Sequence, residues 1–170
     1  MYDVPYRLIG GALMILAEEV AGFDGRKLVF GGVFAVANRL QRLLDARLPE
    51  LTARQWWTLV ILDLFDQPPT LTQLAQAMDT SHQSVKGIVK HLEAGGFVEL
   101  SADPKDARAQ RVNPTAKVAQ WSEATLGQQE AFMDAMFTSM SDAEAEALGE
   151  ALMKVHAALG VLENQKGTNR

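Results

Sequence analysis

The order of local signals in the middle of this chain constrains its fold more than any other feature of the sequence. Residues 73–78 form a short helical pattern, residues 79–80 a tight turn, and the next helical pattern runs to about Ala94. Glycines at 95–96 end this second pattern, because glycine is favoured just past the last turn of a helix. The sequence therefore predicts a short helix, a tight turn and a longer helix.

A β-hairpin is predicted directly after these helices. Residues 97–100 alternate like a strand, and residues 110–113 return as a second strand, which Pro114 ends. Between them, residues 103–106 read Asp-Pro-Lys-Asp, which is turn chemistry. Two helices followed by a hairpin is the order of a winged helix-turn-helix, whose second helix enters the DNA major groove.

Hydroxyl residues mark the expected starts of the helices. A hydroxyl in front of a helix accepts one of its unpaired backbone N–H groups, and a Gln or Glu three residues later completes a capping box. The single caps that we expect are Thr52, Thr72 and Thr115, and the capping boxes pair Thr80 with Gln83 and Ser141 with Glu144.

Long helical patterns flank this middle segment on both sides. We expect helices over residues 5–20, 27–47 and 118–140, and a further one after residue 141. The last helix carries apolar residues at alternating steps of four and three, which keep one seam facing a partner helix. This seam consists of Leu148, Leu152, Val155, Leu159 and Leu162. Packing within the subunit is an alternative, but long end helices leave much apolar surface uncovered in a monomer, so we favour packing between subunits.

The expected fold class is mainly α (α+β), a winged helix-turn-helix with long N- and C-terminal dimerisation helices. We expect residues 49–115 to form the winged helix-turn-helix and residues 1–48 and 116–170 to form a helical dimerisation region.

Charge is distributed unevenly along the chain. The 16 basic and 21 acidic residues give a net charge of −5, which argues against a protein covered in basic charge for nucleic acid. Residues 70–117, however, carry six basic and five acidic residues, whereas residues 118–170 carry three basic and eight acidic ones. The expected DNA-binding part is therefore close to neutral, and the acidity lies in the C-terminal arm.

The composition excludes several kinds of chemistry. The chain has no cysteine, so it has no disulfides, thiolate metal sites or cysteine nucleophiles, and it fits the cytoplasm. Its three histidines lack metal-ligand spacing, so we expect no metal, no cofactor and no enzyme activity. Residues 8–17 form a ten-residue apolar stretch, against the roughly 20 residues that a membrane span needs, so we expect no membrane partner.

The second helix of the helix-turn-helix has an apolar side and a polar side. The apolar side, which we expect to be buried, consists of Val85, Ile88, Val89 and Leu92. The opposite side is polar or basic and has no carboxylate, which suits base edges and phosphates, although any solvated helix face is polar. The residues that we expect to contact DNA are Thr72, at the start of the first helix, and, at and on the second helix, Ser81, His82, Gln83, Ser84, Lys86, Gly87, Lys90 and His91.

Gly87 lies at the centre of this outward side. A glycine within a helix costs about 0.5–1 kcal/mol relative to alanine. Two explanations stay open at this point. The missing side chain lets the helix backbone approach the bases, or the residue is a neutral change at an exposed position.

The hairpin carries the remaining expected DNA contacts. Cations at its tip suit a narrow minor groove, where the negative potential is enhanced. Asp106 lies two residues before Arg108 and could orient its guanidinium through a charge-assisted hydrogen bond. The expected contacts are Lys105, Asp106, Arg108 and Arg111.

Several sequence blocks follow one another here in a specific order and spacing. They are LTARQW at 51–56, LTQLA at 71–75, SV at 84–85, IVKHLE at 88–93, GFV at 96–98 and DPKDAR at 103–108, followed by Val112 and Thr115. In these blocks residues 50–118 resemble the MarR family of winged-helix transcription regulators. With the flanking helices, the resemblance covers the chain from about residue 27 onward. Arg108 matches the family's wing arginine and Asp106 its aspartate partner.

The resemblance implies a homodimer that binds a palindromic operator on double-stranded DNA and usually represses nearby genes. It also implies a small-molecule effector, often a phenolic or aromatic acid, bound between the dimerisation and DNA-binding parts. Two positions depart from the family pattern. Gly87 stands where a polar side chain is common, and Pro114 replaces an aliphatic residue, which would shorten the second strand. The first 26 residues exceed the usual family start.

The residues of an effector pocket are less readable. Asn38 and Arg42 lie four residues apart, off the main apolar stripe of their helix, and Trp57 cannot share a helix face with Trp56. A carboxylate or phenol can use such groups beside an aromatic wall. We therefore place Asn38, Arg42 and Trp57 in the expected pocket, with a surface arginine and a packed tryptophan as the plainer explanation.

An alternative function is a winged-helix protein-interaction module without sequence-specific DNA binding. The basic outward side and the hairpin arginine argue against it, and salt-dependent binding to DNA distinguishes the two.

Overall fold

The computed structural model describes residues 25–167, and the chain divides into two compact units, Met1–Val118 and Ala119–Arg170. The helix expected over residues 5–20 lies outside the described residues. The described part is mainly helical with one two-stranded antiparallel sheet, which confirms the expected fold class. None of its helices combines the length and the hydropathy that a membrane span needs.

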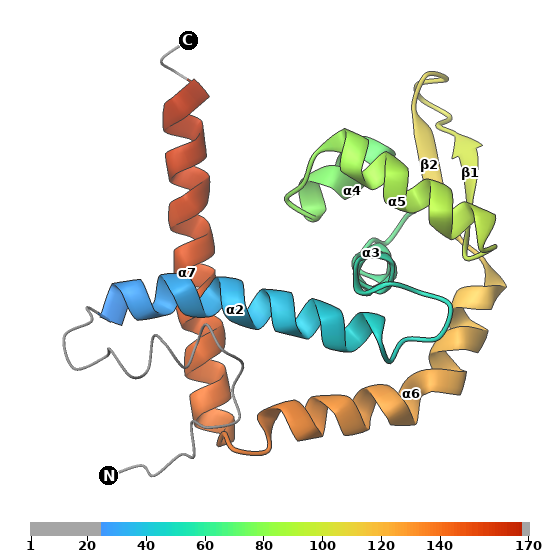
Figure 1. The fold of residues 1–170 in the computed structure, drawn as a ribbon. Coiled ribbons are helices and arrows are strands. Elements are labelled where there is room, and N and C mark those ends of the chain that lie inside the picture. The colour runs from blue at the N-terminus through green and yellow to red at the C-terminus, as the bar shows by residue number, and fades with distance from the viewer. Residues whose placement is uncertain (1–24, 168–170) are drawn as a thin grey trace. The chain divides into compact units, whose positions relative to one another are not determined.

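Four helices and a hairpin build most of the first unit (Figure 1). The helices are α2 (Gly25–Asp45), α3 (Ala53–Asp63), α4 (Leu71–Ala77) and α5 (His82–Ala94), in the order that the sequence predicts. α5 lies at the centre of this unit, because it contacts α3, α4 and β1. α2 contacts α3, but none of its own residues is buried.

Capping boxes begin α3 and α4, and one of the two caps differs from the prediction. Thr52 caps α3 as expected and forms a box with Gln55. α4 is capped by Thr70, whereas the sequence analysis placed this cap at Thr72. Thr70 is favoured because Gln73 follows three residues later and its side chain accepts the Thr70 N–H at 2.8 Å. The hydroxyl of exposed Thr72 is therefore not used as a cap.

The turn between α4 and α5 moves the next cap by one residue. Asp79 adopts a φ of 48°, and the N–H of Thr80 donates to a carbonyl of α4 at 3.0 Å. This N–H is already paired, so the capping box expected for Thr80 and Gln83 is wrong. Ser81 caps α5 instead, and its hydroxyl accepts the N–H of Ser84 at 3.1 Å.

β1 (Val98–Ala102) and β2 (Gln110–Pro114) form the expected antiparallel hairpin. Gly96, with a φ of 74°, turns the chain from α5 into β1, which a residue with a side chain does less easily. Pro114 pairs with Val98 at the last position of β2, so both strands keep five residues and the expected shortening is wrong.

β2 is attached to residues 68–69, which precede α4. The N–H of Val112 donates to the carbonyl of Pro69 at 2.9 Å, and the Arg111 guanidinium donates to the carbonyl of Pro68. The same guanidinium pairs with Asp103 Oδ2 at 2.6 Å. β2 is therefore held to the segment before α4 by both main chain and side chain.

The core of the first unit centres on the inward side of α5. Val85, Val89 and Leu92 are at most 1% exposed, and Ile88 is half-buried, which confirms the predicted apolar side. Burying each such side chain contributes about 1.5–3 kcal/mol. The same core contains Leu59, Leu62, Leu71, Leu74, Phe97, Val98 and Val112.

Two long helices complete the chain. α6 spans Ala116–Phe137 and continues across the boundary between the units, and α7 spans Asp142–Gly167. The N–H of Glu144 donates to the Ser141 hydroxyl at 3.3 Å and the N–H of Ser141 to the Glu144 carboxylate at 2.8 Å, which confirms the expected box. The five residues of the predicted α7 seam are each 41–55% exposed.

Asp103 anchors the loop of the hairpin. It is 7% exposed, and its Oδ1 accepts the N–H groups of Lys105 at 2.6 Å and of Asp106 at 3.1 Å. The hydrogen bond from Lys105, with those from Asp106 and Arg111 and the charge of Arg111, lowers the pKa of Asp103 below its ordinary 3.8, although burial opposes this.

We expect the charged form of Asp103 to stabilise the folded hairpin. Because its pKa is lower in the folded chain than in the unfolded one, this contribution is complete above about pH 4 and is lost as the pH falls through the folded-state pKa. Asp103→Asn should therefore lower the free energy of unfolding at neutral pH.

Urea unfolding of both proteins from neutral pH to about pH 3 checks this. The difference between them should shrink in acid, and a difference that stays constant contradicts the prediction. Glu144, whose pKa is lowered by its hydrogen bonds with Ser141, titrates in both proteins and cancels in the comparison.

Candidate nucleic-acid interface

The outward side of α5 is polar and open to solvent. Because the opposite side is buried against α3, α4 and β1, the helix has one orientation in the unit. Glu93, in the last turn, is the single acidic residue of α5. The exposed residues before it are His82, Gln83, Ser84, Lys86, Gly87, Lys90 and His91. All of them belong to the set that the sequence assigned to DNA contact.

The N-terminal end of α5 suits an anion. Its first turn has no acidic residue, and a helix N-terminus presents unpaired N–H groups with a partial positive charge. Ser81 and His82 are exposed there, and the hydroxyls of Ser81 and Ser84 lie 2.8 Å apart. Gln83 is exposed next to this end, and a glutamine side chain has the groups that can bind a base edge.

Gly87 is not required by packing. A Cβ atom built on it meets nothing within 4 Å, and its φ is not in the left-handed region. The fold therefore tolerates a side chain at this position. The two explanations that remain are close approach of a binding partner to the helix backbone and neutral change.

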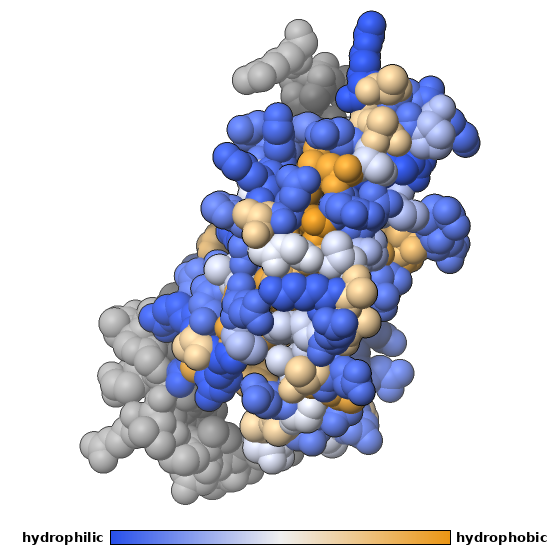
Figure 2. Space-filling view, turned by 90° about the vertical axis from the view of Figure 1, so that its right-hand side faces the viewer, coloured by the Kyte–Doolittle hydropathy of each residue, from blue (hydrophilic) through white to orange (hydrophobic). Residues whose placement is uncertain are grey.

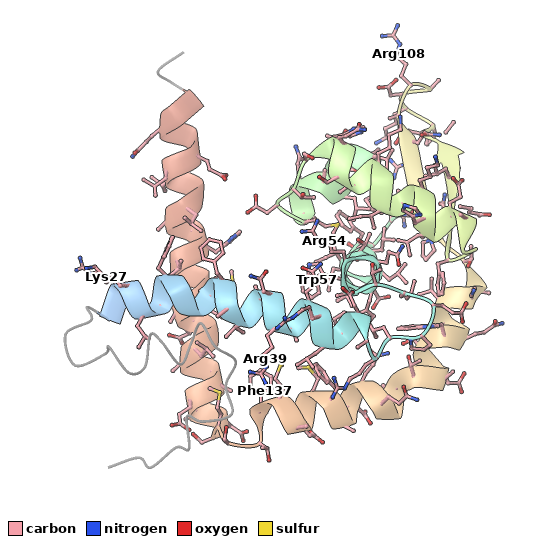
Figure 3. The ribbon with its side chains drawn as sticks, viewed as in Figure 1. Lys27, Arg39, Arg54, Trp57, Arg108 and Phe137 are labelled. Carbon is pink, nitrogen blue, oxygen red and sulfur yellow. The ribbon has the colours of Figure 1, made fainter. Side chains whose placement is uncertain are left out.

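Two aspartates shape the hairpin tip by accepting hydrogen bonds from its backbone, and two cations there have no ion pair within residues 25–167. Asp103 accepts the N–H of Lys105, and Asp106 accepts the N–H of Arg108 at 3.0 Å, each two residues further along the chain. The expected contact between Asp106 and the Arg108 guanidinium is replaced by this backbone contact. Arg108 instead extends away from the tip of the hairpin (Figure 3). Figure 2 shows the face that lies on the right-hand side of Figure 1, where the hairpin is, and this face is mainly hydrophilic.

Arg111 occupies a different environment from the other predicted hairpin contacts. Its side chain is 24% exposed and pairs with Asp103, and its buried Nε has no hydrogen-bond partner among the described residues. The side chain thus joins β2 to Asp103 and to Pro68, whereas those of Lys105 and Arg108 are exposed. A DNA contact by Arg111 stays a prediction.

The three residues of the expected effector pocket lie on two helices. Asn38 and Arg42 are exposed on α2, and Trp57 is 48% exposed on α3. Residues 25–118 do not enclose them. Arg54, which the sequence analysis missed, is exposed three residues before Trp57, and both side chains lie on α3 (Figure 3).

The described residues contain no group of three or more side chains suited to a metal ion.

Sequence reasoning also missed Asp103 as a functional residue. It shapes the loop that presents Lys105 and Arg108, and the signal for it was present. An aspartate two residues before a backbone N–H in a turn commonly accepts a hydrogen bond from that group.

Comparison with known proteins agrees with this geometry. The sequence of residues 50–109 matches the model of the MarR family. No curated protein matched the chain.

Several solved structures have the same fold. A probable transcriptional regulator from Pseudomonas aeruginosa is 28% identical, with a TM-score of 0.65 over 74% of this chain and 95% of that one. MepR of S. aureus, solved as a DNA complex, is 20% identical, with a TM-score of 0.69 over 76% and 97%. BpsR of Bordetella bronchiseptica, whose DNA binding is regulated by 6-hydroxynicotinic acid, is 22% identical, with a TM-score of 0.63 over 75% and 98%.

The match over residues 50–109, together with the helix-turn-helix and hairpin in this part of the chain, identifies this segment as a winged helix-turn-helix of the MarR family.

Proposed function

We propose that this chain is a dimeric transcriptional repressor that binds a palindromic operator through α5 and the hairpin. The observation that carries the proposal is the pairing of the exposed polar and basic residues of α5 that precede Glu93 with a hairpin tip whose aspartates bond to backbone N–H groups. Lys105 and Arg108 remain free for phosphate or minor-groove contacts. An enzyme function is not part of the proposal, and contact with chromosomal DNA implies a cytoplasmic location.

Exposed apolar faces support the dimer. On α2, Val29, Phe30, Phe34 and Val36 are each 51–70% exposed, and the α7 seam is also exposed. Large exposed apolar side chains gathered on one helix are typical of interfaces between proteins. Residues 1–48 and 116–170 are therefore proposed as the dimerisation region, with residues 49–115 as the DNA-binding domain.

A small aromatic acid or phenol is proposed as the effector. The BpsR structure provides the precedent, since 6-hydroxynicotinic acid regulates the DNA binding of that protein. In this chain, exposed arginines at 42 and 54 offer a carboxylate partner, and Trp57 offers an aromatic surface. Asn38 adds a neutral hydrogen-bonding group on α2.

The function is tested by selecting bound sequences from a random DNA pool with the purified full chain. A dimer with two copies of α5 should select two half-sites about 34 Å apart, related by a palindrome. Affinity for the selected site should exceed that for random duplex by roughly a thousandfold or more and should fall as salt rises. Equal affinity for both duplexes contradicts the proposal and favours the protein-interaction module.

Arg108→Ala should weaken binding to the selected site by about 1–3 kcal/mol, or roughly 5- to 150-fold. The reason is that its guanidinium projects from the hairpin tip without an ion pair among the described residues. Fluorescence anisotropy measures the loss. Lys154→Ala is the matched control, because Lys154 is exposed on α7 and pairs with Glu150. Unchanged affinity of the Arg108 variant would remove this residue from the interface.

Gly87→Ala should raise the free energy of unfolding by about 0.5–1 kcal/mol, because alanine favours helix and its methyl group meets no other atom. If the α5 backbone approaches the bases at this position, the same variant binds the selected site more weakly. Gly127→Ala on α6, where a Cβ also meets nothing, is the control for a stability effect alone. Full operator affinity in a stabilised Gly87 variant would show that close approach is not needed.

A further inference from the structure

One ammonium group joins three segments that are far apart in the sequence. Lys117, in the first turn of α6, donates from Nζ to Glu50 Oε2 at 2.6 Å and to the carbonyl of Gly95 at 3.1 Å. The same atom lies 4.3 Å from the centre of the Phe97 ring, which is 1% exposed. The segment before α3, the end of α5 and the start of α6 therefore meet at Lys117.

Gly95 is the C-cap of the recognition helix α5. The last carbonyls of a helix lack partners within it and form its negative pole, so a cation is the natural group to bind there. In this protein the cation comes from another helix. The C-terminal end of α5 and the first turn of α6 are thereby linked by a charge-assisted hydrogen bond.

Glu50 is held in an unusual backbone conformation. Its φ is 66°, in the left-handed region that residues other than glycine, asparagine and aspartate seldom adopt. Such strain persists where the surroundings impose it and clusters at functional positions. Leu51, the next residue, is buried at 6% exposure, so the conformation is fixed where the carboxylate is presented to Lys117.

Thr115 strengthens the same link. Its hydroxyl donates to the carbonyl of Gly96 at 2.7 Å, and its N–H donates to the carbonyl of Phe97 at 2.9 Å. The residues that lead into α6 are thus bonded to the connection between α5 and β1. Because α6 is one continuous helix from Ala116 to Phe137, its first turn also leads into the second unit.

We propose that Lys117, together with Glu50, is a positioning residue for DNA binding. It holds the C-terminal end of the recognition helix against the first turn of α6 and makes no DNA contact of its own. The proposal rests on the proposed function.

Removal of the Glu50 charge changes DNA affinity in opposite directions if Glu50 positions α5 and if it only repels phosphate. Removing a carboxylate from a DNA-binding domain reduces repulsion of phosphate and so favours binding. The positioning role requires the opposite for the selected site, because Lys117 loses its partner. Glu50→Gln keeps the size of the side chain and removes only its charge, which makes it the sharpest variant.

The experiment measures affinity for the selected site and for random duplex across a range of salt, in the full chain. Lys117→Met and Glu50→Gln should each weaken specific binding by about tenfold, with the salt dependence of the wild type. Lys117→Arg, which keeps the charge and donors, should retain most of the affinity. Lys154→Met, which removes a lysine from an exposed pair on α7, is the control and should bind as the wild type does.

Two results would overturn the proposal. Tighter or equal binding by Glu50→Gln means that the junction does not position α5. A fall of about one in the slope of log affinity against log salt for Lys117→Met means that Lys117 contacts a phosphate directly.

If the protein prefers no DNA sequence, the proposed function fails, but the junction can still be tested by amide hydrogen exchange. The N–H groups of Gly96 and Phe97 donate to carbonyls of α5, at 2.9 Å in both cases. Lys117→Met and Glu50→Gln should speed their exchange, and Lys154→Met should not. Unchanged exchange in the first two variants would refute the junction itself.

Discussion

The burial of one side of α5 is the interaction on which the rest of the first unit depends. Val85, Val89 and Leu92 are almost completely buried, and α3, α4 and β1 pack against the helix that carries them. Burial of these apolar side chains stabilises the unit. It also fixes the orientation of α5, because a helix with one buried side exposes the opposite side to solvent. The polar and basic residues of α5 are exposed for this reason. The candidate DNA-contact residues and the centre of the buried core therefore lie on a single helix.

Acidic and basic residues have different roles around this helix. Asp103 and Asp106 accept hydrogen bonds from backbone N–H groups of the hairpin, while the side chains of Lys105 and Arg108 are exposed. These carboxylates shape the loop by binding its backbone. A protein with a net charge of −5 can therefore still present local positive charge. Glu50 has a related role, since it binds Lys117 at the end of α5. A net charge averaged over the chain conceals this arrangement.

The order of the elements and the two sides of α5 could be predicted because the signals are local. Apolar periodicity marks the helices, and alternation with turn residues marks the hairpin. The caps show where local reasoning fails. Thr72 and Thr80 are plausible caps by composition, but Thr70 has the better-placed glutamine, and the N–H of Thr80 is already used at the end of α4. The Thr70 box is itself a local signal that the prediction overlooked. The loss of the Thr80 cap depends on backbone geometry, which composition does not specify.

The sequence by itself determined the helix-turn-helix, the hairpin and the polar outward side of α5, since each follows from residues a few positions apart. Only the tertiary structure decided the roles of Arg111 and Lys117. Arg111 donates to a carbonyl 43 residues away, and Lys117 binds a carboxylate 67 residues away. In the sequence, Arg111 was predicted to contact DNA, and Lys117 was one of the six basic residues of the segment 70–117. Their partners depend on the path of the whole chain, because a contact between distant segments exists only after the core has brought those segments together.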